Sequence, residues 1–154
     1  MLESEAGNGA KYSMKDKGIS ILLVEDDEID AMNVKRAFKK CNITNPLFVA
    51  ENGLDALAKL RGDGDEKIIP TPKVILLDIN MPKMNGIEFL QELRADPELK
   101  SISVVVLTTS NEERDKVAAY NLNVAGYILK PVEPAKFIEA IHTLDVYWNL
   151  IEMP

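Results

Sequence analysis

The sequence lacks the cysteine pairs that form disulfides and the long apolar runs that span membranes. It contains one cysteine, Cys41, and one histidine, His142. A single cysteine cannot form a disulfide within the chain, and because Cys41 continues an apolar helical stripe we interpret it as a buried structural thiol. His142 is predicted to lie on a helix surface, without a catalytic role. No apolar run reaches membrane-span length, and no basic segment followed by an apolar run opens the chain. We therefore expect a cytoplasmic protein that does not engage a membrane.

Positively charged residues are fewer than negatively charged ones. The chain has 18 Lys and Arg against 25 Asp and Glu, which gives a formal net charge of −7. This balance argues against non-specific binding to nucleic acid and against a polybasic membrane anchor, but it is compatible with a metal site. A length of 154 residues, with 46% apolar and 28% charged residues, fits one soluble domain with a proper core.

Five short apolar segments stand at intervals along the chain and are predicted to be strands: 19–24, 46–50, 74–77, 104–107 and 126–129. A segment with helical spacing follows each one, and the last helix is predicted from about Pro134 to Ile151. This alternation predicts an α/β protein with five parallel strands and five helices. A doubly wound, flavodoxin-like sheet with strand order 2-1-3-4-5 is the natural arrangement.

Two other stretches are polar. Residues 1–18 are predicted to be a disordered N-terminal tail, which leaves residues 19–154 as one domain with an extended C-terminal helix. The connection at residues 62–73 carries two glycines and ends near Pro70 and Pro72. It is long for a compact α/β unit; we favour a surface insertion over a binding loop.

Reactive side chains follow four of the predicted strands, namely Glu25 and Asp26, Asp78, Thr108 and Lys130. Alone, Asp78 would fit a helix N-cap or a turn, and the acids from Glu25 to Asp27 would suit the positive end of the following helix. However, the carboxyl ends of parallel strands meet at one edge of the sheet, where α/β proteins bind ligands. The coincidence at four strand ends favours a functional site.

The carboxylates of this set suggest a metal ion. Three acids at one edge repel one another unless a cation joins them, and hard oxygen ligands suit Mg²⁺. Asp26 and Asp78 are the predicted direct ligands, Glu25 is expected to act through water, and the backbone carbonyl of Asn80 is a further candidate ligand.

A lysine and a hydroxyl directed at a metal-bound carboxylate suit a phosphoryl group. Asp78 is the candidate nucleophile, which would form an acyl phosphate. Lys130 would hold one phosphoryl oxygen as a point charge, and Thr108 would donate its hydroxyl to another.

These residues carry a resemblance to a known family. The chain resembles a response-regulator receiver domain of two-component signalling over residues 19 to about 145. The matching segments, which occur in the family's order, are Ile21-Leu22-Leu23-Val24-Glu25-Asp26-Asp27, Leu77-Asp78-Ile79-Asn80-Met81-Pro82 with Gly86, Val106-Leu107-Thr108-Thr109-Ser110, and Gly126-Tyr127-Ile128-Leu129-Lys130-Pro131.

The resemblance implies a phosphoacceptor signalling domain that catalyses only its own phosphorylation and dephosphorylation. Asp78 resembles the phosphoacceptor, Glu25 and Asp26 the acid pair that holds Mg²⁺, and Lys130 the lysine that precedes what is usually a cis-proline bond, here at Pro131. Glu25 stands where aspartate is commoner in the family.

Four further positions take their meaning from the same resemblance. Thr108 and Tyr127 resemble the switch pair, in which phosphorylation draws the hydroxyl inward and the aromatic ring follows. Asn80 and Ser110 stand at positions that tune phosphoryl lifetime in such domains.

A finer resemblance concerns the small, single-domain response regulators of cyanobacterial and bacterial phytochromes. It is carried by Pro70-Thr71-Pro72, Leu107-Thr108-Thr109-Ser110-Asn111-Glu112-Glu113 and Tyr147-Trp148-Asn149-Leu150. It implies a sensor histidine kinase as partner, with a phytochrome-type kinase as the candidate. The sequence after Lys130 fits only one helix, so output is expected through protein contacts or phosphorelay.

The predicted last helix has more apolar residues than one core-facing stripe needs. The stripe consists of Phe137, Ile141, Leu144, Trp148 and Ile151. The helix also carries Val146, Tyr147 and Leu150, which cannot all lie on that stripe. We predict a homodimer through this helix and the face of strands 4 and 5, and the alternative is that the helix end packs over its own domain.

Two other functions compete with the phosphoacceptor switch. A phosphatase with an aspartyl-phosphate intermediate usually has a second carboxylate two residues after the nucleophile, and Asn80 at that position argues against it. An adaptor that binds partners without phosphorylation would not need the intact set of acids, threonine and lysine.

Overall fold

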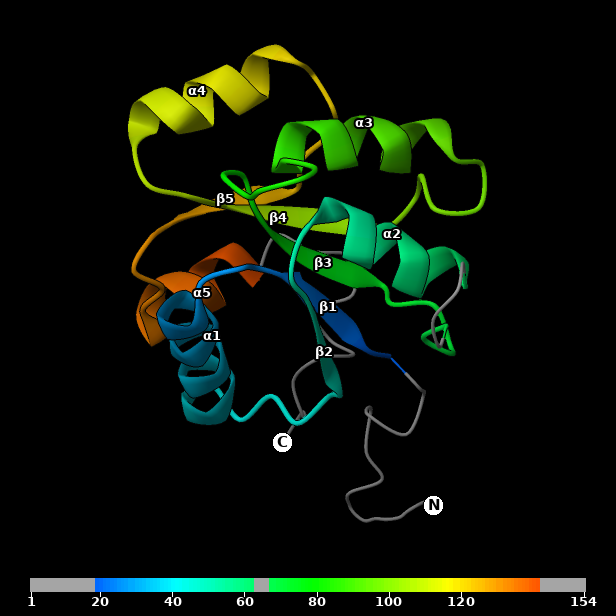
Figure 1. Cartoon of the computed structure of the whole chain (residues 1–154). Coiled ribbons are helices and arrows are strands. Elements are labelled where there is room, and N and C mark those ends of the chain that lie inside the picture. The colour runs from blue at the N-terminus through cyan, green and yellow to red at the C-terminus, as the bar shows by residue number, and fades with distance from the viewer. Residues whose placement is uncertain (1–18, 63–66, 142–154) are drawn as a thin grey trace.

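The computed structural model describes residues 19–62 and 67–141, and over these ranges the chain alternates strands and helices (Figure 1). In chain order the elements are β1 (Ile21–Val24), α1 (Glu28–Lys40), β2 (Leu47–Ala50), α2 (Gly53–Arg61), β3 (Val74–Asp78), α3 (Gly86–Ala95), β4 (Ser103–Thr108), α4 (Asn111–Ala119), β5 (Gly126–Leu129) and α5 (Pro134–Ile141). The described strands form one parallel sheet in the order β2-β1-β3-β4-β5, which confirms the predicted fold and strand order.

Helices cover both faces of the sheet (Figure 1). Helices α1 and α5 pack on one face, where Val34 and Phe38 of α1 meet Phe137 of α5, with the Phe38 and Phe137 ring centroids 5.1 Å apart. Helices α2, α3 and α4 cover the other face and contribute, among others, Phe89 and Val117 to its core.

The central strand β3 shows why its sequence is apolar throughout. Ile75 and Leu77 belong to the core beneath α2 and α3, whereas Val74 and Leu76 belong to the core beneath α1 and α5. Successive strand side chains point to opposite faces, so a strand covered on both sides has no solvent-facing position. The strand ends at the polar residue Asp78, which lies at the edge of the sheet where the strands end.

Several predicted boundaries differ slightly from the observed ones. Strand β1 begins at Ile21 although Ile19 is buried, and β4 extends over Ser103–Thr108, beyond the predicted 104–107. Cys41 caps the C-terminal end of α1 and is only partly buried, with its Sγ 3.6 Å from the carbonyl oxygen of Pro134. The prediction of a buried thiol is therefore confirmed only in part, although the burial that remains raises the pKa of Cys41.

Helix α4 is the most weakly packed helix on its face of the sheet. Val117 is its buried residue, and Tyr120, which follows the helix, is 47% exposed. None of the helices within residues 19–62 and 67–141 combines the length and the apolarity that a membrane crossing needs. The predictions for the tail 1–18, for residues 63–66 of the long connection, and for His142 and the rest of the last helix lie outside the described residues.

Candidate functional site

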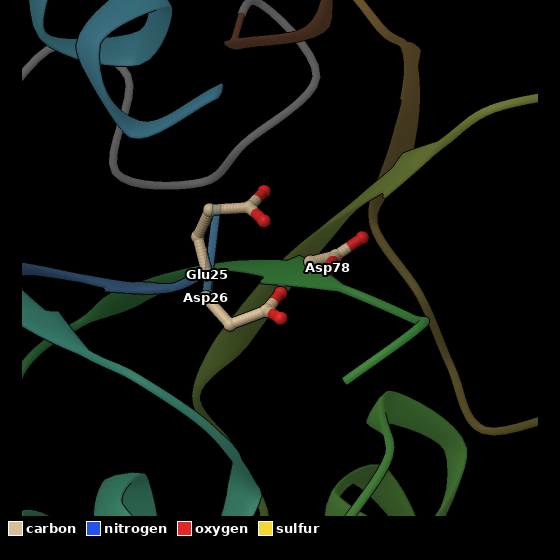
Figure 2. A group of neighbouring side chains, drawn as sticks. All are labelled: Glu25, Asp26 and Asp78. Carbon is tan, nitrogen blue, oxygen red and sulfur yellow. The ribbon is translucent and has the colours of Figure 1, made fainter. Parts of the chain in front are cut away.

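The predicted site residues lie where the strands end at one edge of the sheet. Asp78 is the last residue of β3 and is paired in register with Leu107, so Thr108 lies one position further along β4. Lys130 directly follows β5, and its backbone N–H donates to the carbonyl oxygen of Thr108 at 2.7 Å. Figure 2 shows the three acids, Glu25, Asp26 and Asp78, gathered at the ends of β1 and β3.

The three carboxylates form a group that suits a divalent cation. One oxygen of each of Glu25, Asp26 and Asp78 lies within 4.8 Å of the others. Glu25 and Asp78 are each 3% exposed, whereas Asp26 faces solvent. Several hard oxygen donors close together are the ligands that Mg²⁺ and similar ions prefer, so the residues present fit such an ion.

Lys130 reaches into the same pocket. Its Nζ lies 2.8 Å from Asp78 Oδ1, 2.9 Å from Glu25 Oε1 and 3.1 Å from Asp30 Oδ2. The peptide bond between Lys130 and Pro131 is cis, as the family resemblance implied. The structure thus brings Glu25, Asp26, Asp78 and Lys130 together, as the sequence predicted.

The two buried acids, Glu25 and Asp78, resist ionisation. Burial raises the pKa of Glu25 to about 7, with a further rise from the charge of Asp78, against the lowering effect of Lys130. Burial also raises the pKa of Asp78, partly offset by the hydrogen bond from Lys130. Burial opposes the charge on Lys130, but the hydrogen bonds to Asp78 and Glu25 outweigh it and raise the Lys130 pKa. One ammonium does not fully compensate the carboxylates, and a second cation would favour their ionised form.

The alternative roles considered for the acids are now resolved. Asp27 is the N-cap of α1, since its side chain accepts hydrogen bonds from Ile29 N at 2.9 Å and Asp30 N at 3.0 Å. Glu25 and Asp26 are therefore left to the pocket. Asp78 is not a helix cap, because Asn85 caps α3 in a capping box with Glu88.

A close backbone approach positions the loop after Asp78. Gly86 N–H donates to the Ile79 carbonyl oxygen at 2.9 Å, which folds the start of α3 onto the end of β3. A Cβ at position 86 would lie 2.6 Å from the Asp78 carbonyl oxygen and 2.8 Å from Ile79 Cα. Only glycine allows this contact without displacing the backbone that carries Asp78.

The remaining predicted residues lie around the pocket. Thr108 is 1% exposed, and Tyr127, which is paired in register with Val106, is partly buried against the core beneath α2, α3 and α4. Asn80 is exposed, and its side-chain amide donates to the Glu113 carboxylate of α4. Metal binding by the Asn80 carbonyl stays a prediction.

Sequence reasoning missed three residues that complete this region. Asp30 lies in the first turn of α1, yet it shares Lys130 with Glu25 and Asp78. Its position three residues after the N-cap Asp27, on the first turn, was the available signal. In the sequence, Glu113 and Arg114 fit the pattern of ordinary charged residues on a helix surface. In the structure, Glu113 accepts a hydrogen bond from Asn80, and Arg114 lies over the ring of Tyr127.

Comparisons with known proteins agree on one family. The model of the response regulator receiver domain matches residues 21–142. The response regulator Rcp1 of Synechocystis sp. is 39% identical over 128 residues, which cover 83% of this chain and 87% of that protein. Two solved structures are also similar. The bacteriophytochrome response regulator RtBRR has a TM-score of 0.81 and 41% identity, with 88% of this chain and 83% of that chain covered. The Mn²⁺-bound form of Rcp1 has a TM-score of 0.70 and 37% identity, with 88% and 99% covered.

Proposed function

The chain belongs to the response regulator receiver domain family, and we propose that Asp78 is its phosphoacceptor. In this proposal a sensor histidine kinase donates the phosphoryl group, and the regulator passes the signal on by protein contact or phosphorelay. The observation that carries the proposal is the position of Lys130. Its Nζ lies 2.8 Å from Asp78 Oδ1, and the carboxylates of Glu25 and Asp26 lie beside Asp78.

The transfer step uses groups that the pocket already holds in place. A carboxylate oxygen of Asp78 forms a bond to phosphorus while the P–N bond to the donor imidazole breaks, and the imidazole nitrogen leaves with the electron pair. Lys130 Nζ, which already touches the Asp78 carboxylate, is placed to bind a phosphoryl oxygen. The hydroxyl of Thr108, one position beyond the level of Asp78 on β4, is the proposed donor to a second oxygen.

The proposed metal ion is Mg²⁺, held by Asp26 and Asp78 directly, by Glu25 through water and by the Asn80 carbonyl. When bound, Mg²⁺ supplies positive charge to the carboxylates and to the transferring phosphoryl group. The raised pKa values of Glu25 and Asp78 support this assignment, because burial opposes the ionised forms of both acids and a bound cation would favour them. The similarity to the Mn²⁺-bound form of Rcp1 supports a divalent ion here.

In this proposal the chain catalyses only its own phosphorylation and dephosphorylation. Thr108 and Tyr127 are the proposed switch residues. Both residues lie on neighbouring strands, β4 and β5, next to the pocket. A shift of the Thr108 hydroxyl towards a phosphoryl group would open space that the Tyr127 ring can enter, which would change the surface beside β5.

The proposed partners follow from the relatives. Similarity to a bacteriophytochrome response regulator makes a phytochrome-type kinase the candidate donor. A homodimer through the C-terminal helix and the face of β4 and β5, a domain over residues 19–154 and a tail over 1–18 belong to the same proposal. So does a cytoplasmic location, because a kinase that uses ATP works where ATP is found.

The test is direct phosphorylation of the full chain by phosphoramidate with Mg²⁺. We expect one hydroxylamine-labile phosphate per chain in the wild type and none in Asp78→Asn, as measured by intact mass. The same adduct in Asp78→Asn would mean that another residue is the acceptor. Failure of the wild type to form an adduct would favour the adaptor function, and rapid turnover of many phosphate esters would favour the phosphatase.

A further inference from the structure

Helix α4 is attached to the domain by few apolar contacts and by two charged residues of its N-terminal half. Of the residues in α4, all of which the structure describes, Val117 is the buried one. Glu113 and Arg114 follow one another in the chain, and each contacts a residue of a different element. The position of α4 therefore depends on polar contacts more than on burial.

Glu113 connects two loops of the phosphorylation site. One carboxylate oxygen accepts a hydrogen bond from Thr109 N at 3.0 Å, and the other accepts one from the side-chain amide of Asn80. Asn80 lies two residues after Asp78, and Thr109 directly follows Thr108. A single side chain of α4 thus joins the loop after β3 to the loop after β4.

Arg114 connects the same turn to the aromatic residue of β5. Its Cζ lies 5.6 Å from the centroid of the Tyr127 ring, which is within the range of a cation–π contact. Tyr127 is partly buried against the core beneath α2, α3 and α4, and the guanidinium lies over its ring. Because Glu113 and Arg114 are adjacent on one helical turn, a shift of Glu113 also moves Arg114.

We propose that Glu113 and Arg114 are positioning residues that couple the charge state of Asp78 to the position of Tyr127. This inference rests on the proposed function of Asp78. A phosphoryl group adds about two negative charges close to Asn80, and Glu113 is a carboxylate bound to that same residue. The added charge weakens the contact between Glu113 and Asn80, loosens the first turn of α4 and withdraws Arg114 from the ring. By linkage, removing the Glu113 contact in advance favours the phosphorylated arrangement.

The experiment follows Tyr127 by fluorine NMR in the full chain labelled with 3-fluorotyrosine. The Tyr127 resonance is identified from Tyr127→Phe, and beryllofluoride with Mg²⁺ is titrated as the mimic of phosphorylated Asp78. The variants are Glu113→Ala, Glu113→Gln and Arg114→Ala. The matched control is Glu112→Ala, which removes the same charge from the same turn at an exposed side chain for which the described part of the chain shows no ion pair or side-chain hydrogen bond.

In the free protein, Glu113→Ala moves the Tyr127 resonance towards its beryllofluoride-loaded position, and it lowers the half-saturating beryllofluoride concentration about five-fold. Glu113→Gln, which keeps one acceptor oxygen, gives an intermediate shift. Arg114→Ala also moves the resonance and lowers the half-saturating concentration about two-fold. Glu112→Ala behaves as the wild type.

The inference is overturned if Glu113→Ala and Glu113→Gln, both folded by circular dichroism, match Glu112→Ala in the free-protein resonance and in the titration. Failure of the proposed function looks different. In that case the wild type takes no phosphate from phosphoramidate and its spectrum does not respond to beryllofluoride, whereas the free-protein shift in Glu113→Ala still reports on the Glu113 contact.

Discussion

Helices α3 and α4 lie on the same face of the sheet, yet different forces hold them (Figure 1). Helix α3 begins in a capping box and buries Phe89, Leu90 and Leu93 completely. Helix α4 is of similar length and buries Val117. Apolar burial is insensitive to a change of charge nearby, whereas hydrogen bonds and cation–π contacts respond to it.

The difference assigns different tasks to the two helices. Helix α3 follows the loop that connects it to Asp78 at the end of β3, and its tight packing keeps the proposed phosphoacceptor in place. Helix α4 can shift at low cost because little apolar area is lost when it does. A fixed acceptor and a movable neighbour are what a switch requires.

The largest expected effect tests the difference in packing directly. Phe89→Ala removes a fully buried ring from α3 and should lower the free energy of unfolding by about 4 kcal/mol. Val117→Ala in α4 should cost only about 2 kcal/mol, because it removes two methyl groups. Urea unfolding monitored by circular dichroism measures both values, and equal losses would contradict the proposed contrast.

The second effect concerns Arg94, a side chain of α3 that also hydrogen-bonds to the segment after α4. Arg94 donates to the carbonyl oxygens of Lys100, Ile102 and Leu122 at 2.8 Å and of Asn123 at 3.0 Å. Arg94→Met keeps the apolar stem but leaves these oxygens without the guanidinium, so we expect a loss of about 3 kcal/mol in urea unfolding. The exposed neighbour Gln91→Ala is the control, and its unfolding curve should match the wild type.

The third effect concerns the free-energy cost of keeping the buried Glu25 side chain ionised. The pKa of Glu25 is raised from 4.5 to about 7 in the folded chain, so the folded state binds the proton more tightly than the unfolded state. The resulting stabilisation is complete below about pH 4.5 and is lost as the pH rises through 7. Relative to Glu25→Gln, the wild type should therefore lose about 3 kcal/mol between pH 4.5 and pH 8 in EDTA.

Adding Mg²⁺ at pH 8 separates the cause of this loss. An ion among the carboxylates favours their charged form, so Mg²⁺ should stabilise the wild type more than Glu25→Gln in the same unfolding measurement. If the difference in the free energy of unfolding between the wild type and Glu25→Gln did not change with pH, folding would not raise the pKa of Glu25.

The smallest effect compares the helices without any mutation. Amide hydrogens in the second half of α4 should exchange about ten times faster than those of α3, a difference of about 1.4 kcal/mol in opening free energy. Hydrogen exchange followed by NMR measures it. Slower exchange in α4 than in α3 would mean that contacts other than Val117 fix this helix.

Most of the fold was predictable because its signals are local. The apolar runs at Val74–Leu77 and 104–107 mark strands buried on both faces, and the alternation with helices defines the order of a doubly wound sheet. Strand ends were less predictable. Ile19 is as apolar as Ile21, yet the ladder begins only at Ile21, because pairing depends on where β2 and β3 run.

The pocket was predictable to the extent that its residues follow strands. Glu25, Asp78 and Lys130 each stand at a strand end, and parallel strands bring such ends together. Asp30 was missed because its position in the first turn of α1, three residues after the N-cap Asp27, suits an ordinary helix-end acid as well as a partner of Lys130. Glu113 was missed because its partner Asn80 is 33 residues away in sequence and on another element.

The three-way sharing of Lys130 has a consequence for the speed of the reaction. The side chain of Lys130 is only 10% exposed, and its Nζ is surrounded by oxygens of Asp78, Glu25 and Asp30. The ammonium group is therefore stripped of most of its hydration shell when the protein folds, before any donor docks. In the proposed transfer an incoming phosphoryl oxygen would exchange with a carboxylate oxygen, so solvent would not have to reorganise around the lysine at that moment.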